Sequence, residues 1–171
     1  ASDVYKRQAV STLSISTVPT FAGAWLSPRL GKFQMNHPNL AVRLETSDTL
    51  VDFAREDITV AIRAGAGVWP GLEAHHLMAV EYTPMISPEL ARRHVLSEPA
   101  DLLKLPLLDP GDENWALWMK TAGVERWEDY RKPGLTMSTD LHEARAALAG
   151  YGVALLQPDF FRYELATGGL I

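Results

Sequence analysis

The segment VPTFAGAWLSPRLGKF, residues 18–33, joins a run of β-branched residues to a helical pattern, and this junction decides the fold class. Before it, residues 13–18 (LSISTV) alternate apolar and polar side chains, which predicts a strand. After it, apolar residues recur with helical spacing at Phe21, Trp25, Leu26, Leu30 and Phe33. Ser27-Pro28 interrupts that pattern and predicts a kink or a restart, because proline suits a first helical position.

The residues that follow extend this beginning into an alternating pattern. Residues 40–46 (LAVRLET) alternate as a strand, and Ser47 or Asp48 is placed to cap a short helix. Residues 58–63 (ITVAIR) are nearly all apolar, as expected for a buried parallel strand. The order β-α-β-α-β predicts an α/β fold with a parallel sheet covered by helices.

The second half of the chain has helix and strand patterns of its own. We predict one or two strands within residues 72–87 and further strands at 134–139 and 153–157. Helices are predicted to start at Ser87 and to span 112–123, 139–150 and 158–168. Two α/β lobes are therefore expected: residues 1–11 are a tail, 12–82 the first lobe and 83–171 the second.

Composition excludes several classes of function. The chain has 171 residues, a net charge of −5 and no cysteine, so disulfides, thiolate catalysis and zinc–thiolate sites are excluded. Its 16 basic residues never form a block longer than two, which disfavours direct contact with DNA. No apolar stretch approaches 18 residues and no signal peptide is visible, so we expect a cytoplasmic protein that crosses no membrane.

Motifs for catalysis, metals and cofactors are weak. His75 and His76 are adjacent and would point to opposite faces of a strand, and His142 has no ligating partner four residues away. The GAG at residues 65–67 lacks the spacing of a dinucleotide loop, and no serine lies in a nucleophile motif. We therefore expect no catalytic residue, no metal, no cofactor and no enzymatic activity.

An ordered set of phrases resembles a known family. Residues 19–77, from PTFAGAWLSPRL to GLEAHHL, are similar to the effector-binding domain of LysR-type transcriptional regulators, in the branch of the glycine-cleavage activator and the β-lactamase regulator. The later phrases SPEL, NWALWMKTAG and ARAALAGYGVALLQ match that branch in order and spacing. The resemblance covers nearly the whole chain.

The resemblance implies a type-2 periplasmic-binding-protein fold, with two lobes and a small effector in the cleft between them. It also implies that the family's DNA-binding domain precedes this segment and that its first lobe is completed by residues beyond Ile171, so we expect a C-terminally incomplete fold with an exposed edge strand. The residues expected to bind effector are Pro19, Thr20, Phe21, Thr46, Ser47, Asp48, Arg63, Ser138, Thr139 and Asp140.

The chemistry expected at this site is that of anion recognition. A helix start after a strand offers N–H groups and a favourable dipole, Thr20 adds a hydroxyl, and Arg63 adds a guanidinium for an effector carboxylate. Asp140 stands where serine is common in the branch, so it would repel an anion, recruit an amine or only cap a helix. The alternatives for Thr20, Ser47, Asp48 and Thr139 are helix caps, and for Arg63 a structural ion pair.

The partners expected from the resemblance are a small-molecule effector, such as a carboxylate, an amino acid or a cell-wall fragment, and a second copy of the chain. Family effector domains pair through the first helix and the second strand, which here places Leu26, Leu30, Phe33 and Val42 at a dimer interface. DNA would be contacted only through the missing N-terminal domain. The alternative function is that of a periplasmic-type solute-binding protein for a small anionic metabolite.

Overall fold

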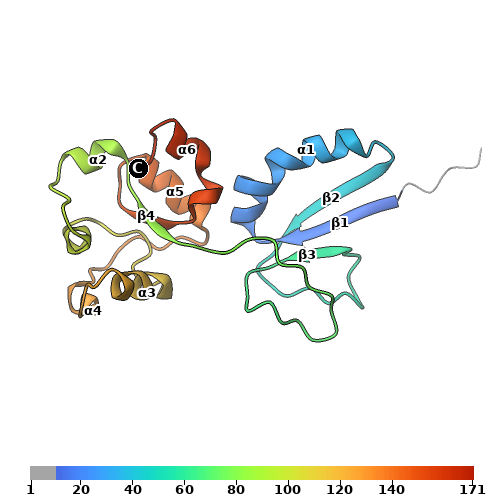
Figure 1. Cartoon of the computed structure of the whole chain (residues 1–171), viewed down its shortest axis with the longest axis horizontal. Coiled ribbons are helices and arrows are strands. Elements are labelled where there is room, and N and C mark those ends of the chain that lie inside the picture. The colour runs from blue at the N-terminus through green and yellow to red at the C-terminus, as the bar shows by residue number, and fades with distance from the viewer. Residues whose placement is uncertain (1–10) are drawn as a thin grey trace, which may run out of the picture. The chain divides into compact units, whose positions relative to one another are not determined.

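Two compact units, Ala1–Val68 and Trp69–Ile171, make up the chain. The computed structural model describes residues 11–171, apart from the Tyr130 side chain. Most of the predicted tail, residues 1–10, lies outside the described residues, and Ser11 already begins the first strand. Figure 1 shows the elements of each unit.

A parallel three-stranded sheet forms the centre of the first unit. Strand β1 (Ser11–Thr17) lies between β2 (Leu40–Thr46) and β3 (Val60–Ile62), and both neighbours run parallel to it. The predicted parallel sheet is thus confirmed, with β2 and β3 as its edges among the described residues. The helix α1 (Ser27–Asn36) packs along β2 (Figure 1).

The helix type changes at Ser27, but the predicted cap and restart are not observed, because Leu26 and Ser27 are both helical and no side chain caps α1. Residues Phe21–Leu26 form a wide π-helical turn, and α1 continues from Ser27. Ser27 donates both its backbone N–H and its Oγ to the carbonyl of Ala22, the latter at 2.6 Å. Pro28 stands near the start of α1 and donates no backbone hydrogen bond to the preceding turn.

The short helix predicted after Ser47 is wrong. Residues 48–59 form an irregular loop with a single turn, in which Asp52 accepts the backbone N–H of Ala54 at 3.0 Å. Leu50 is 69% exposed and Phe53 37% exposed. A helix this short needs an apolar face to bury, and these side chains bury little.

The second unit is built from short helices around a two-stranded antiparallel sheet of β4 (Thr83–Met85) and β5 (Ala154–Leu156). Leu107 and Val153 add an isolated parallel bridge. The helical elements of the unit are α2 (Pro88–Arg92), η2 (Pro99–Lys104), α3 (Glu113–Thr121), α4 (Trp127–Tyr130), α5 (Asp140–Leu148), η3 (Pro158–Phe160) and α6 (Arg162–Ala166).

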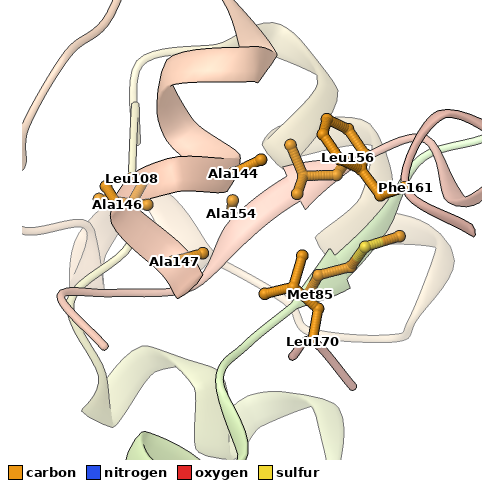
Figure 2. Close-up of a cluster of buried hydrophobic side chains, with 9 residues drawn as sticks. All are labelled: Met85, Leu108, Ala144, Ala146, Ala147, Ala154, Leu156, Phe161 and Leu170. Carbon is orange, nitrogen blue, oxygen red and sulfur yellow. The ribbon is translucent and has the colours of Figure 1, made fainter. Parts of the chain in front are cut away.

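The core of the second unit consists of two clusters of buried side chains. In one, alanines of α5 face the small Ala154 of β5, beside Leu156 and Phe161 (Figure 2). The small residues let the helix backbone approach the strand. The other cluster surrounds Trp115, which is fully buried and donates its Nε1–H to the carbonyl of Leu108 at 2.9 Å.

The strand predicted at residues 134–139 is wrong, whereas one of the one or two strands predicted within 72–87 is observed. Residues 134–138 are not part of a ladder, although the backbone N–H of Asp109 donates to the carbonyl of Leu135 at 2.7 Å. Gly134 lies so close to the neighbouring segment that a Cβ would stand 2.6 Å from the carbonyl oxygen of Leu107. Within 72–87 only Thr83–Met85 is a strand. The final predicted helix is broken at Phe161 into η3 and α6.

Candidate functional site

Three parallel strands of the first unit end at the same edge of the sheet. Thr17 of β1 lies in register with Thr46 of β2 and with Ile62 of β3. The backbone N–H of Ser47 donates to the carbonyl of Thr17 at 2.9 Å, and the Thr17 hydroxyl donates to the carbonyl of Ile62 at 3.2 Å. Carboxyl ends of parallel strands are where α/β sheets bind ligands.

Arg63 follows β3 directly and is held at this edge by neutral oxygen atoms. Its guanidinium donates to the Oγ of Ser16 at 2.8 Å, to the carbonyl of Thr49 at 2.9 Å and to that of Ile62 at 2.9 Å. Its Nε is buried without a hydrogen-bond partner, and among residues 11–171 no carboxylate forms an ion pair with it. The structural ion pair considered as an alternative is therefore not formed within these residues.

The junction after β1 brings Pro19, Thr20 and Phe21 to the same edge. The first hydrogen bond of the helix runs from the N–H of Ala22 to the carbonyl of Val18 at 3.0 Å. Thr20 is helical and 7% exposed, and its side chain makes no capping hydrogen bond, so the capping alternative is wrong. The Phe21 ring is buried and stacks on Trp25, with 5.0 Å between ring centroids.

The loop after β2 contributes Thr46, Ser47 and Asp48. The Ser47 Oγ accepts the backbone N–H of Thr49 at 3.1 Å, a local turn rather than a helix cap. The carbonyl of Thr49 also accepts a hydrogen bond from the Arg63 guanidinium, so this turn connects the loop to Arg63. The sequence-predicted residues of the first unit therefore lie together, at the ends of β1, β2 and β3.

The predicted residues of the second unit lie at the start of α5. Thr139 caps this helix, with its side chain accepting the N–H of His142 at 3.3 Å, so the capping alternative for Thr139 is confirmed. Asp140 is the first residue of the helix. Burial and the nearby Asp112 carboxylate raise the pKa of the Asp140 carboxyl. The Ser138 Oγ lies 3.4 Å from Nδ1 of His142.

Sequence reasoning missed a buried acid beside these residues. Glu143 of α5 is 6% exposed, and burial together with the Asp140, Asp109 and Asp112 carboxylates raises its pKa to about 8. Burial, together with the Asp140, Asp112 and Glu143 carboxyl groups, raises the pKa of Tyr82 to about 12. A glutamate in a first helical turn usually faces water, so no local pattern indicates this burial.

Among the described residues, no group of three or more His, Asp or Glu side chains is arranged to hold a metal ion. Within the same part of the chain, no helix has the length and apolar character needed to cross a bilayer.

Of the residues predicted for a dimer interface, Leu26 is buried, whereas Leu30, Phe33 and Val42 are half-buried.

Comparisons with known proteins agree with this architecture. The family model described as "LysR substrate binding domain" matches residues 6–171. The chain is 39% identical over 157 residues to the HTH-type transcriptional activator AmpR of Pseudomonas aeruginosa, covering 91% of this chain and 52% of that protein. It is 34% identical over 167 residues to the glycine cleavage system transcriptional activator of Escherichia coli K12, covering 96% and 54%.

Solved structures show that the similarity also holds for the three-dimensional fold. The effector domain of AmpR of Pseudomonas aeruginosa is 37% identical, with a TM-score of 0.78 over 94% of this chain and 77% of that chain. The effector binding domain of AmpR from Citrobacter freundii gives 31% identity and a TM-score of 0.75 over 94% and 80%. The chain spans about half the length of the curated relatives it matches. The α/β units, the parallel strand order and these matches together show that the chain belongs to the LysR substrate-binding domain family, with its type-2 periplasmic-binding-protein-like fold.

Proposed function

We propose that this chain is the effector-sensing domain of a LysR-type transcriptional regulator and that it binds a small anionic effector at the strand edge of the first unit. The observation that carries the proposal is Arg63, a guanidinium fixed by three neutral oxygens without a carboxylate partner among the described residues. Such a cation is already oriented, so an incoming carboxylate can be bound without ordering a mobile side chain.

Neighbouring groups at the same edge favour an anion as well. The helix that starts at Pro19 directs its positive dipole end toward this edge, and the Thr20 hydroxyl is the nearest side-chain donor of that turn. A carboxylate, an amino acid or a cell-wall fragment fits this chemistry. Ser138, Thr139 and Asp140 of the second unit stay predictions, and repulsion of an anion, recruitment of an amine and helix capping are all open for Asp140.

The biological role follows from the relatives, which are transcriptional activators. Effector binding would be coupled to DNA binding by the difference in effector affinity between two states of the protein, typically about 1–3 kcal/mol. DNA would be contacted through a separate N-terminal domain, in the cytoplasm, and no catalytic step is assigned to this chain. The relatives support this role over that of a solute-binding protein for a transporter.

Replacing Arg63 by glutamine is expected to remove effector binding. The ligand is found first by a thermal-shift screen of small carboxylates, amino acids and muropeptides, where a ligand at 100 times its Kd stabilises the fold by about 2.7 kcal/mol. Loss of a charge-assisted hydrogen bond should weaken binding of that ligand by about 10- to 100-fold in calorimetry. Arg55→Gln is the matched control, because Arg55 is exposed and lies in the loop away from the strand ends.

A second variant separates binding from folding, because Arg63 also supports the loop through Thr49. Thr20→Val keeps the shape of the side chain and removes the hydroxyl, so it should weaken binding while leaving the melting temperature within a few degrees. A ligand whose affinity is unchanged in both variants would place the effector elsewhere and contradict the proposal.

A homodimer through α1 and β2 is the second part of the proposal. Leu30 is half-buried on α1, so Leu30→Asp should reduce the mass measured by sizing chromatography with light scattering toward that of one chain. A folded Leu30→Asp variant with the mass of the unmodified chain would exclude this interface. Met35→Asp serves as the control, since Met35 is 77% exposed on the same helix.

A further inference from the structure

A hollow in the second unit is lined by none of the residues predicted to bind effector. Its volume is about 260 Å³, and its lining is apolar except for three cationic side chains. A second hollow adjoins it, and the two share residues 131–134 as lining. We call the first hollow the Leu107 groove, because the segment around Leu107 forms its floor.

The floor of the Leu107 groove is held by backbone contacts and by the core beneath it. Leu105, Leu107 and Leu108 are buried. The N–H of Leu108 donates to the carbonyl of Val153 at 2.8 Å, and the N–H of Val153 donates to that of Pro106 at 2.9 Å. The groove is therefore a feature of the folded unit and needs no rearrangement to form.

The rim of the groove exposes large side chains. Tyr151 is 73% exposed and Leu135 is 54% exposed. Gly134 keeps the segment before Leu135 in close contact with the floor, since a Cβ at Gly134 would stand 2.6 Å from the carbonyl of Leu107. Exposed apolar surface beside a preformed hollow is the usual setting of a small-molecule site.

The side chains that line the groove carry positive charge, whereas the chain as a whole is negatively charged. The net charge of the chain is −5, yet the side chains that line both hollows include cations and no acid. Lys104 is ion-paired with Asp101. The Cζ atom of Arg131 lies 5.8 Å from the centre of the Trp127 ring, and the guanidinium donates to the carbonyl of Pro110. Lys132 has no ion pair among residues 11–171. Two of the three cations therefore lack an acidic partner within the described chain.

We propose that the Leu107 groove binds a small amphipathic carboxylate. The apolar part lies on Leu103, Pro106 and Leu135 beside the Tyr151 ring, and the carboxylate faces Arg131 and Lys132. The site is separate from the strand edge of the first unit and would give the domain a second ligand. The proposal does not depend on the effector site, because no residue is shared between the two.

Octanoate is the probe, and two-dimensional NMR of the 15N-labelled chain is the measurement. Octanoate should shift the backbone amides of residues 105–108, 135 and 151 in a saturable way. Hexanoate lacks two methylenes and should bind about 15-fold more weakly, since each buried methylene is worth about a fourfold change in affinity. The neutral analogue 1-octanol should also bind less tightly than octanoate.

Lys132→Gln tests the charge without touching the core, because Lys132 is exposed. It should weaken octanoate binding by about three- to tenfold, and Tyr151→Ala by a similar factor. Lys120→Gln is the control, since Lys120 is exposed on α3 and does not line the groove. Unchanged affinity in Lys132→Gln, equal binding of 1-octanol, or shifts confined to the first unit would each overturn the proposal. Loss of binding in Arg63→Gln would assign the probe to the effector site instead.

Discussion

Replacing Trp115 by alanine is expected to lower the free energy of unfolding of the second unit by about 4 kcal/mol. Trp115 is fully buried in the cluster with Leu105 and Met119, and removing its ring leaves a cavity that the surrounding helices fill only in part. The change also leaves the carbonyl of Leu108 without the indole N–H that binds it at 2.9 Å. Small domains are stable by only about 5–15 kcal/mol, so this variant should be close to unfolding.

Urea unfolding followed by tryptophan fluorescence and by circular dichroism is the measurement. Trp115→Phe is the matched variant, because it keeps a buried aromatic ring while losing the hydrogen bond and part of the ring volume, so it should cost less than Trp115→Ala. Trp118 is half-buried at the edge of the same cluster, so Trp118→Ala should cost less than Trp115→Ala. Equal midpoints for the alanine variants would contradict the placement of Trp115 at the centre of the core.

Replacing Glu143 by glutamine is expected to stabilise the chain by up to about 4 kcal/mol at pH 8 and to have little effect near pH 4.5, since one pKa unit is worth about 1.4 kcal/mol. The folded state holds the pKa of the Glu143 carboxyl at about 8, above its ordinary value of 4.5. Between these two values the unfolded chain releases the proton while the folded chain keeps it. Stability contributed by the neutral carboxyl is therefore present below pH 4.5 and is lost as the pH rises to about 8.

The measurement is the urea midpoint of both proteins at several values between pH 4.5 and pH 8.5. Glutamine keeps the size of the side chain and cannot ionise, so the advantage of the variant should grow through this window and then become constant. Glu125→Gln is the control, since Glu125 is exposed and should give no such trend. A constant difference between wild type and Glu143→Gln at every pH would contradict the raised pKa.

The strands of the first unit could be predicted from the sequence better than those of the second, because their pattern is local. Strands β1 and β2 follow from alternation that is local, and β2 is observed at the predicted residues 40–46. Their parallel pairing follows from the intervening helix. The helix expected after Ser47 was predicted from capping and spacing alone, and it does not form because Leu50 and Phe53 find no surface to cover.

The candidate site shows the same division. The resemblance predicts the residues after β1, β2 and β3 as parts of one effector site, and the register of Thr17 with Thr46 and Ile62 places these strand ends at one edge of the sheet. Glu143 was missed because its burial and its raised pKa arise from the folded second unit, where the distant Asp109 lies near enough to act on it, and no spacing rule connects the two. The capping role of Thr139 was open in the sequence and is decided by its bond to His142.

The π-helical turn at Phe21–Leu26 determines what the deletion of one residue would do to the first unit. Such a turn is equivalent to one extra residue inserted into an α-helix. Deleting one residue between Phe21 and Leu26 would restore regular winding and turn α1 by about 100° relative to Pro19 and Thr20. The inserted residue therefore sets which side of α1 faces β2 and which faces outward, and a relative without it should expose a different set of α1 side chains.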